Sequence, residues 1–428
     1  MKAHSVKAAS TMILLSGAIA LGSEGISKID TESMIKSIAE TIEENYVYPD
    51  TGEQISQMLL ENLALGNYDD KGKQELAQSL REDLIDLSHD LHFGVRVLPD
   101  GWQPPSDNEE ESVGNGPLAP YGFDSVQRLS GNIGYIELNG FHQAMYVKDT
   151  IEAAMQLLQG SQSIIFDLRS NGGGDPETVQ LISSYLFDPE TPTHLNSLYS
   201  RPNDTTTEYW THDQINTDLV MPQVPVFVLT SGRTFSAAEE FSYNLKNLER
   251  ATLIGETTGG GAHPVNSHII DNQLMIVIPM ARAISPITGT NWEGTGVSPH
   301  VEADASNALD IAIGKSLEMA LENGEAAARW GLATLHSKTN PISLTDQKLN
   351  EFVGSYGQRE IRVIDHALEY RRKGVSDWNP IICFKNDQFV IDGFEGFIME
   401  FTRDKAGIID GINGLYQQGH SDRSARNE

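Results

Sequence analysis

The chain has 428 residues, of which 39% are hydrophobic and 7% aromatic, so it is long enough to bury a sizeable core in two or three domains. Its 60 acidic and 30 basic side chains give a formal net charge of -30, which repels phosphate backbones and anionic membranes and excludes nucleic acid as an expected partner. The single cysteine, Cys383, excludes an intrachain disulfide framework and any zinc site built from several cysteines. Its apolar surroundings predict a buried, inert thiol.

The N-terminus has the pattern of an export signal. Lys2 and Lys7 precede an apolar stretch, residues 12–21, that ends in small side chains. The stretch is short for a membrane span, and acidic, helix-forming sequence follows it. We therefore expect residues 1–22 to be a signal peptide and the protein to be exported, periplasmic or secreted, without an integral membrane segment in the mature chain. An amphipathic first helix is the alternative interpretation.

Residues 30–97 are expected to form a helical N-terminal domain. Apolar side chains recur there at helical spacing in three stretches, the first of which ends at Pro49. Residues 98–125 then contain a Pro-Pro pair, three consecutive glutamates and several glycines, which predicts a solvated linker. This linker is too short to hold an inserted PDZ-type peptide-binding domain.

Residues 126–315 alternate strand-like and helix-like patterns, and this alternation predicts an α/β core. The expected strands are residues 133–138, 163–168, 224–229 and 251–255. A segment rich in Thr, Pro, Asn and Asp, residues 189–223, interrupts the pattern, as loops or hairpins over a functional site often do. Beyond the core, residues 342–418 show short alternating strands and predict a small all-β barrel or sandwich.

Ser236 is the candidate nucleophile. It follows a strand and a short turn and begins a helix, where amides such as that of Ala237 lack intrahelical partners and can donate to an oxyanion. On this motif alone an ordinary N-cap is the stronger interpretation, because Glu239 completes a Ser-x-x-Glu capping box. A second strand runs into a three-glycine turn, from which Gly172 or Gly173 would supply a second oxyanion donor.

Four motifs in order along the chain resemble the signatures of the C-terminal-processing and tricorn-core serine peptidases, in particular the branch with the modules of interphotoreceptor retinoid-binding protein. They occupy residues 167–174, 230–241, 255–260 and 291–299. The resemblance covers about residues 30–315. It implies a crotonase-like α/β spiral core with an N-terminal helical domain and a small C-terminal all-β domain. It also implies hydrolysis of peptides or unfolded proteins without a cofactor, with Ser236 as nucleophile.

The family divides over the general base. One branch uses a lysine after the Gly-Glu-Thr-Thr turn, but the corresponding segment here, residues 259–263, reads Gly-Gly-Gly-Ala-His. The tricorn-like branch uses a histidine from the end of the helical domain, and by resemblance His92 takes that position. An imidazole suits the role because its pKa lies near neutral pH. His89 and His263 remain alternatives for the base, and His92 could instead be structural.

Glu293 matches the acidic residue that supports the histidine in the tricorn-like branch, although a surface carboxylate in a glycine-rich turn is the alternative. Leu91 stands where a tricorn-type site has a polar linking residue, so Asp90 is a second candidate for orienting His92. We predict no metal, because the spacing of His263, His268 and Asp271 matches no familiar zinc pattern.

Two other functions compete with peptidase activity. A non-catalytic module could bind a hydrophobic ligand such as a retinoid or fatty acid, as relatives in the family do, but retention of Ser236, His92 and Glu293 together argues against it. An esterase could use the same oxyanion chemistry, but no Gly-x-Ser-x-Gly elbow surrounds the serine. The sequence therefore predicts a serine endopeptidase that lacks a PDZ domain.

Overall fold

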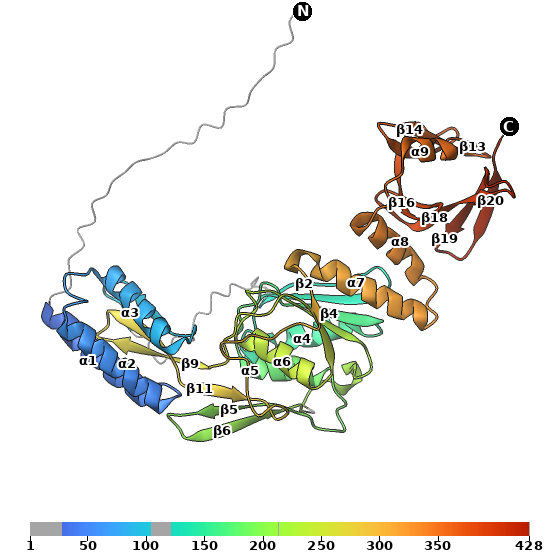
Figure 1. Ribbon diagram of the computed structural model, residues 1–428. Helices are drawn as coiled ribbons and strands as arrows, with labels where there is room; N and C mark the ends of the chain where they lie inside the picture. Colours follow the sequence, from blue (N-terminus) through green and yellow to red (C-terminus); the bar gives the residue numbers. More distant parts are fainter. Residues whose placement is uncertain (1–27, 104–120, 213, 428) are drawn as a thin grey trace, which may run out of the picture.

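The computed structural model describes residues 28–103, 121–212 and 214–427. Three regions follow one another in the chain: a helical N-terminal region, a central α/β core, and a C-terminal β domain (Figure 1). Among the described helices, none combines the length and apolar character needed to cross a bilayer. The predicted signal peptide, residues 1–22, and most of the predicted linker lie outside the described residues.

The N-terminal helices share a hydrophobic core with a hairpin that comes from much later in the chain. The helices are α1 (Lys28–Asn45), α2 (Pro49–Ala64) and α3 (Lys73–Ser88). Their buried side chains pack with Ile270, Leu274 and Ile276 of that hairpin. The hairpin pairs with the strand after α3 in the order β1-β10-β9, where β1 is Gly94–Val97, β9 is Val265–Ile270 and β10 is Leu274–Pro279.

The central core is built on a six-stranded sheet with the order β12-β8-β7-β4-β3-β2, parallel except for the β2–β3 pair. Alternate strand residues face opposite sides, as the period of two requires. Ile164 and Val228 pack with α4, α5 and α6, whereas Ile165 and Leu229 pack with α7. The elements are β2 (Phe123–Leu129), β3 (Ile133–Leu138), α4 (Ala144–Leu158), β4 (Ser163–Asp167), α5 (Pro176–Ser184), β7 (Val226–Thr230), α6 (Ala237–Asn247), β8 (Ala251–Gly255), β12 (Val301–Glu302) and α7 (Ala305–Glu322).

The segment that interrupts the core pattern forms a second, smaller sheet. Strands β5 (His194–Ser200) and β6 (Thr205–Trp210) make a hairpin, and β11 (Ala281–Ile284) pairs with β5. A short 3-10 helix, η1 (Thr217–Leu219), follows the hairpin. Leu198 of β5 lines the same pocket as Ser236, which lies at the N-terminal end of α6.

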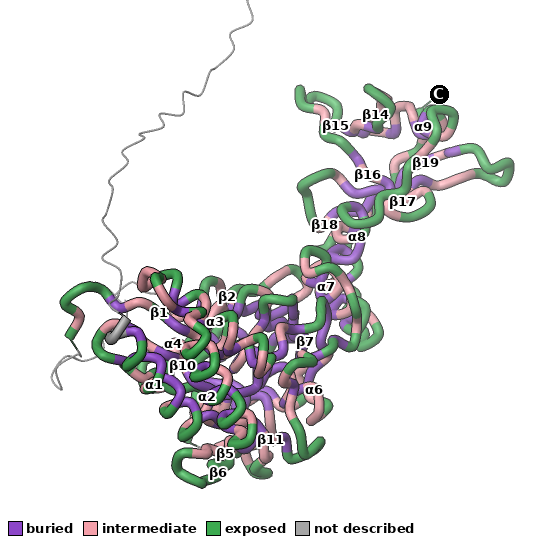
Figure 2. Tube along the Cα trace, turned by 60° about the vertical axis from the view of Figure 1, so that its left-hand side comes forward, coloured by how far each residue is buried: buried purple, intermediate pink, exposed green. Residues whose placement is uncertain are grey.

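The C-terminal β domain is an antiparallel sheet of eight strands that closes on itself. Asn427 donates its amide to the carbonyl oxygen of Ser355 at 2.8 Å, and Tyr356 bridges to Arg426, so the last strand meets the first. Figure 2 shows this domain projecting from the rest of the molecule. The elements are α8 (Ala328–Thr339), α9 (Asp346–Phe352), β13 (Gly354–Tyr356), β14 (Arg359–Ile364), β15 (Ala367–Arg372), β16 (Asn379–Lys385), β17 (Gln388–Ile391), β18 (Phe394–Arg403), β19 (Ile409–Tyr416) and β20 (Ser421–Ala425).

The predicted fold class is confirmed: a mixed α/β core, a helical N-terminal region and a C-terminal all-β domain. The expected strands at residues 133–138 and 251–255 coincide with β3 and β8. The sequence patterns did not identify β9, β10 and β11, which lie in residues 265–284. Cys383 is buried in β16, and burial raises the pKa of its thiol to about 11.

Candidate active site

Ser236 has a strained backbone at the N-terminus of α6. Its φ is 54° and its ψ is -123°, a combination that L residues rarely adopt and that costs about 1–3 kcal/mol. The strain persists because the Ser236 amide donates to Glu239 Oε2 at 2.9 Å. Side chains held in such conformations cluster at functional sites, so this geometry supports a role for Ser236 beyond helix capping.

Glu239 ties Ser236 to the glycine-rich loop that follows β8. Its side chain is completely buried and accepts four hydrogen bonds, from the amides of Ser236, Gly260 and Gly261 and from the Thr258 hydroxyl. Burial raises the pKa of Glu239, while these four donors act in the opposite direction. The carboxyl group therefore fixes the loop against the start of α6.

The three-glycine turn after β4 packs against the same serine. A Cβ atom added to Gly173 would lie 2.6 Å from Ser236 Cβ and 2.9 Å from the Ala237 amide nitrogen, so only glycine fits there. The Gly173 amide donates to Asn171 Oδ1 at 2.8 Å. Within the described residues, the amides of Ala237 and Gly174 have no hydrogen-bond acceptor, and both residues line a pocket beside Ser236. Gly172 does not line this pocket.

That pocket, hereafter the Ser236 pocket, has a volume of about 220 Å³ and brings together side chains from distant parts of the chain. Its lining consists of His92, Gly174, Pro176, Leu198, Ser236, Ala237, Glu240, Gly261, Ala262, His263, Pro264, Val265, Ala283 and Trp292. The sequence-predicted residues Ser236, His92 and Ala237 therefore share one cavity. His89 lies at the exposed C-terminal cap of α3 and does not line it.

His92 lines the same pocket as Ser236, and its ring makes no hydrogen bond within the described residues. Its imidazole stacks on Phe235 with a centroid distance of 4.6 Å, and a Cβ atom on Gly261 would lie 2.5 Å from His92 Cε1. Both ring nitrogens are buried without a hydrogen-bond partner. The nearest charged group is Asp90, whose Oδ1 lies 3.7 Å from His92 Nδ1 and accepts the His92 amide at 3.0 Å.

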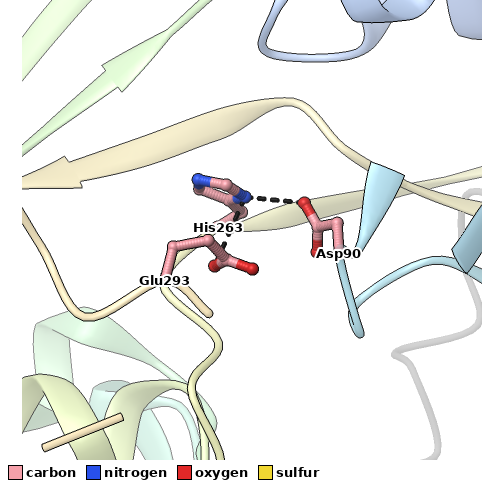
Figure 3. A group of neighbouring side chains, drawn as sticks. All are labelled: Asp90, His263 and Glu293. Atoms are coloured by element: carbon pink, nitrogen blue, oxygen red, sulfur yellow. Dashed lines mark hydrogen bonds and ion pairs between the residues drawn. The ribbon is translucent and has the colours of Figure 1, made fainter. Parts of the chain in front are cut away.

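His263, in contrast, is held at both ring nitrogens. Its Nδ1 lies 2.6 Å from Asp90 Oδ2 and 3.4 Å from Glu293 Oε2. Figure 3 draws both interactions as dashed lines from the imidazole to the two carboxyl groups. Its Nε2 lies 3.3 Å from the Tyr48 hydroxyl. Glu293 also accepts the Ala262 amide at 2.5 Å, and no hydrogen bond joins Glu293 to His92 in the described structure. Glu293 thus contacts His263 rather than the predicted base.

The pKa values of the two carboxyl groups around His263 are shifted in opposite directions. Burial alone would raise the pKa of Asp90, but hydrogen bonds from the His263 ring and from the His92 backbone amide outweigh it and hold that pKa well below its usual range. Burial and the nearby Asp90 raise the pKa of Glu293. Burial and Asp90 also raise the pKa of Tyr46, whose hydroxyl lies 3.4 Å from Asp90 Oδ2. Of the two carboxyl groups, Asp90 is therefore the one whose environment favours the charged form more strongly.

The ligand atoms of Asp90, His263 and Glu293 lie within 4.8 Å of one another, which makes them the group most able to hold a metal ion in the described part of the chain. However, Asp90 and His263 are in direct hydrogen-bond contact at 2.6 Å. Metal–ligand bonds of about 2.0–2.2 Å would hold these two atoms roughly 3 Å or more apart, so an ion would have to separate them. The arrangement matches a carboxylate–histidine pair better than a metal centre.

Two family models match the chain. Residues 132–303, which contain Ser236, His263 and Glu293, match Peptidase family S41. Residues 28–129, which contain Asp90 and His92, match the N-terminal domain of Peptidase S41 in eukaryotic IRBP.

Individual relatives are distant. The carboxyl-terminal-processing peptidase 1, chloroplastic, of Arabidopsis thaliana is 24% identical over 181 residues, which are 42% of this chain and 35% of that protein. The match thus spans about a third of that relative's length. A candidate peptidase from Parabacteroides merdae has a TM-score of 0.50 and 18% identity, covering 68% of this chain and 98% of that one. A lipoprotein from Streptococcus agalactiae has a TM-score of 0.46 and 14% identity, covering 66% and 94%.

Proposed function

The chain belongs to peptidase family S41, a family of serine peptidases, and from this premise we propose that it is an endopeptidase with Ser236 as nucleophile and His92 as general base. The observation that carries the proposal is the Ser236 pocket, where the strained serine, the free imidazole of His92 and the unpaired amide of Ala237 meet. A nucleophile, a base and an oxyanion donor in one cavity are the parts that acyl transfer needs.

We assign the base to His92 rather than His263 because of their partners. Both nitrogens of His263 are engaged, by Asp90 and Tyr48. The ring nitrogens of His92 are free, and in structures without substrate the hydrogen bonds of a catalytic base are often long. Asp90 is the orienting carboxylate in this proposal, since it lies beside His92 Nδ1. Glu293 supports Asp90 indirectly by holding His263.

The proposed reaction is a two-step acyl transfer. His92 accepts the Ser236 hydroxyl proton while the serine oxygen forms a bond to the substrate carbonyl carbon. The carbon–nitrogen bond then breaks, and His92 gives the proton to the leaving amine. In the second step a water molecule loses a proton to His92 and its oxygen attacks the acyl carbon. The bond between the serine oxygen and the acyl carbon then breaks, His92 returns the proton to the serine oxygen, and the new carboxylic acid is released.

The oxyanion formed in each step would be stabilised by backbone amides. The Ala237 amide is the first donor, as the sequence predicted. For the second we propose Gly174, because its amide is free and it lines the pocket, whereas the Gly173 amide is engaged with Asn171. In this proposal Gly173 donates no hydrogen bond to the oxyanion, and its missing side chain leaves room for Ser236. Gly172 is then only a residue of the turn.

We further propose that the enzyme is exported and cleaves short or unfolded peptides. The proposal of export rests on the charged and apolar pattern of residues 1–22. Only residues 98–122 separate β1 from β2, which is too short for a PDZ-type domain that would bind protein C-termini.

Cleavage of unfolded protein substrates by three variants tests the proposed roles. Ser236→Ala should lower kcat/KM at least about a thousandfold, because nucleophile and base act as a unit, and His92→Gln should do the same. His89→Gln makes the same chemical change three residues from His92, on the surface, and should leave activity unchanged. Wild-type rates in Ser236→Ala would remove this serine from the mechanism.

A further inference from the structure

Glu240 lies one helical turn after Ser236, and both residues line the Ser236 pocket. The Glu240 amide donates to the Ser236 carbonyl oxygen at 2.9 Å, as a spacing of four residues in a helix requires. A substrate side chain that enters the pocket beside the attacked carbonyl would therefore come close to Glu240.

The carboxyl group of Glu240 is buried without a counter-charge. The residue is 6% exposed, and neither lysine nor arginine pairs with it in the part of the chain that the structure describes. Burial, followed by the nearby Asp175, raises the pKa of Glu240 to about 7. Buried ionisable groups are normally paired, because burying an unpaired charge is costly.

Two buried amides beside Glu240 also lack partners. Asn196 on β5 is fully buried and Asn244 on α6 is 2% exposed. Both act to lower the pKa of Glu240, yet all four of their amide atoms lack a hydrogen bond of normal geometry. Nearly all buried polar groups in folded proteins are hydrogen-bonded. Glu240, which lines the pocket, has no counter-charge, and the two asparagines beside it make no hydrogen bond of normal geometry, so this group has polar capacity left for a ligand.

We propose that Glu240, backed by Asn196 and Asn244, forms the subsite for the substrate residue on the acyl side of the scissile bond, and that this residue is lysine or arginine. The inference rests on the proposed serine-peptidase function. A lysine or arginine side chain carries its charge at the end of an apolar stem. The pocket offers apolar walls for the stem, including Leu198 and Trp292, and a carboxyl group for the charge.

The test uses three peptides that differ only at the residue before the scissile bond: arginine, citrulline or leucine. Citrulline has nearly the shape of arginine but no charge. Wild-type kcat/KM should be at least about a hundredfold higher for arginine than for citrulline, because an unpaired buried group rejects a ligand that cannot satisfy it. In Glu240→Gln the ratio should fall to near one, whereas Glu249→Gln, at an exposed position two residues after the end of the same helix, should keep it.

Labelling of Ser236 by a fluorophosphonate separates failure of this inference from failure of the proposed function. Labelling together with equal cleavage of the arginine, citrulline and leucine peptides would overturn the subsite assignment, as would cleavage on the amino side of arginine. If the protein neither labels nor cleaves any peptide, the proposed function fails and the subsite with it. The wild-type comparison decides the matter even if Glu240→Gln does not fold, and Glu240→Asp, which keeps the charge, should retain the preference for arginine.

Discussion

The Ser236 pocket and the C-terminal β domain differ in how far their polar side chains are paired. Around the pocket, buried groups lack hydrogen bonds: both ring nitrogens of His92, one carboxylate oxygen of Glu293, and the amides of Asn196 and Asn244. In the β domain, charged side chains form ion pairs: Arg362–Glu369 and Arg371–Glu360 join the adjacent strands β14 and β15, and Arg359–Asp422 and Arg403–Asp387 join segments farther apart in the sequence. The contrast indicates that the pocket is organised to receive a ligand and the β domain to stabilise itself.

The backbone shows the same contrast. In the β domain, non-glycine residues with positive φ such as Asp365, His366 and Asp387 lie between paired strands, where tight hairpin turns require that conformation. Ser236 has positive φ at the start of a helix, where no turn type demands it. Hydrogen bonding to Glu239 maintains the conformation instead. Substitutions that remove support from each region should therefore have different consequences.

The largest effect of such a substitution is expected for Glu239→Gln. The glutamine side chain would place an NH2 group where Glu239 has a carboxylate oxygen. The backbone amides of Ser236, Gly260 and Gly261 would then lose one of the two oxygens that accept their hydrogen bonds. Leaving buried donors unsatisfied should cost about 3–5 kcal/mol of unfolding free energy. We also expect kcat to fall about 10- to 100-fold, because the serine loses its fixed position. Urea unfolding and peptide cleavage on the same preparation measure both effects.

Glu256→Gln is the matched control. Glu256 also accepts two backbone amides, those of Gly232 and Ala305, but its side chain is exposed and does not line the Ser236 pocket. Water can replace the lost acceptor there, so kcat should stay near the wild-type value. Equal losses in the two variants would mean that Glu239 supports only the general fold.

The buried carboxyl group of Glu240 in the Ser236 pocket should make the unfolding free energy depend on pH. Its pKa is raised from 4.5 to about 7, so between these values the folded protein keeps a proton that the unfolded chain has released. Stability therefore falls as pH rises through this window, by up to about 3 kcal/mol, and the loss persists above it. Glu240→Gln removes this loss, although Asp175 and Tyr209 remain nearby.

Urea unfolding at about pH 4.5 and about pH 8 measures this difference. Relative to wild type, Glu240→Gln should gain unfolding free energy at the higher pH, while Glu249→Gln should show no such gain. The same substitution that abolishes the proposed preference for arginine would then stabilise the fold, as expected for a residue kept for function. If the difference in unfolding free energy between Glu240→Gln and wild type does not change with pH, Glu240 is not a buried carboxyl group without a counter-charge.

The smallest effect is expected in the β domain. Arg403 lies between Asp387, which it contacts through two nitrogens, and Glu351. Arg403→Met should lower the unfolding free energy of this domain by about 1–2 kcal/mol, because Asp387 loses a charge-assisted contact through two nitrogens, while Glu351 keeps its pair with Lys348. Arg423→Met breaks the more exposed pair with Asp410 and should lower the unfolding free energy less than Arg403→Met does, because solvent screens that pair. Neither variant should change kcat/KM, and a large loss of activity would assign the β domain a direct role in catalysis.

Local patterns predicted four of the six strands of the core sheet, but not β2 and β12, and placed Ser236 at the start of a helix, because apolar alternation and helix-start signals extend over a few residues. The pairing of Asp90 with His263 could not be predicted, since 173 residues separate them and neither lies in a distinctive local motif. Glu239 was recognisable as a capping residue, but its hydrogen bonds to Gly260 and Gly261 depend on the tertiary fold. Strands β9 and β10 were missed, although their apolar residues complete the core of the N-terminal helices.

The most direct test of the account is to locate the covalent adduct formed when the full chain reacts with a fluorophosphonate. Peptide mass spectrometry should find one modified residue, Ser236, and His92→Gln should slow the modification at least about a hundredfold, because the base no longer activates the hydroxyl. Modification of a different serine, or an unmodified Ser236 in protein that cleaves peptides, would contradict the assignment of the nucleophile.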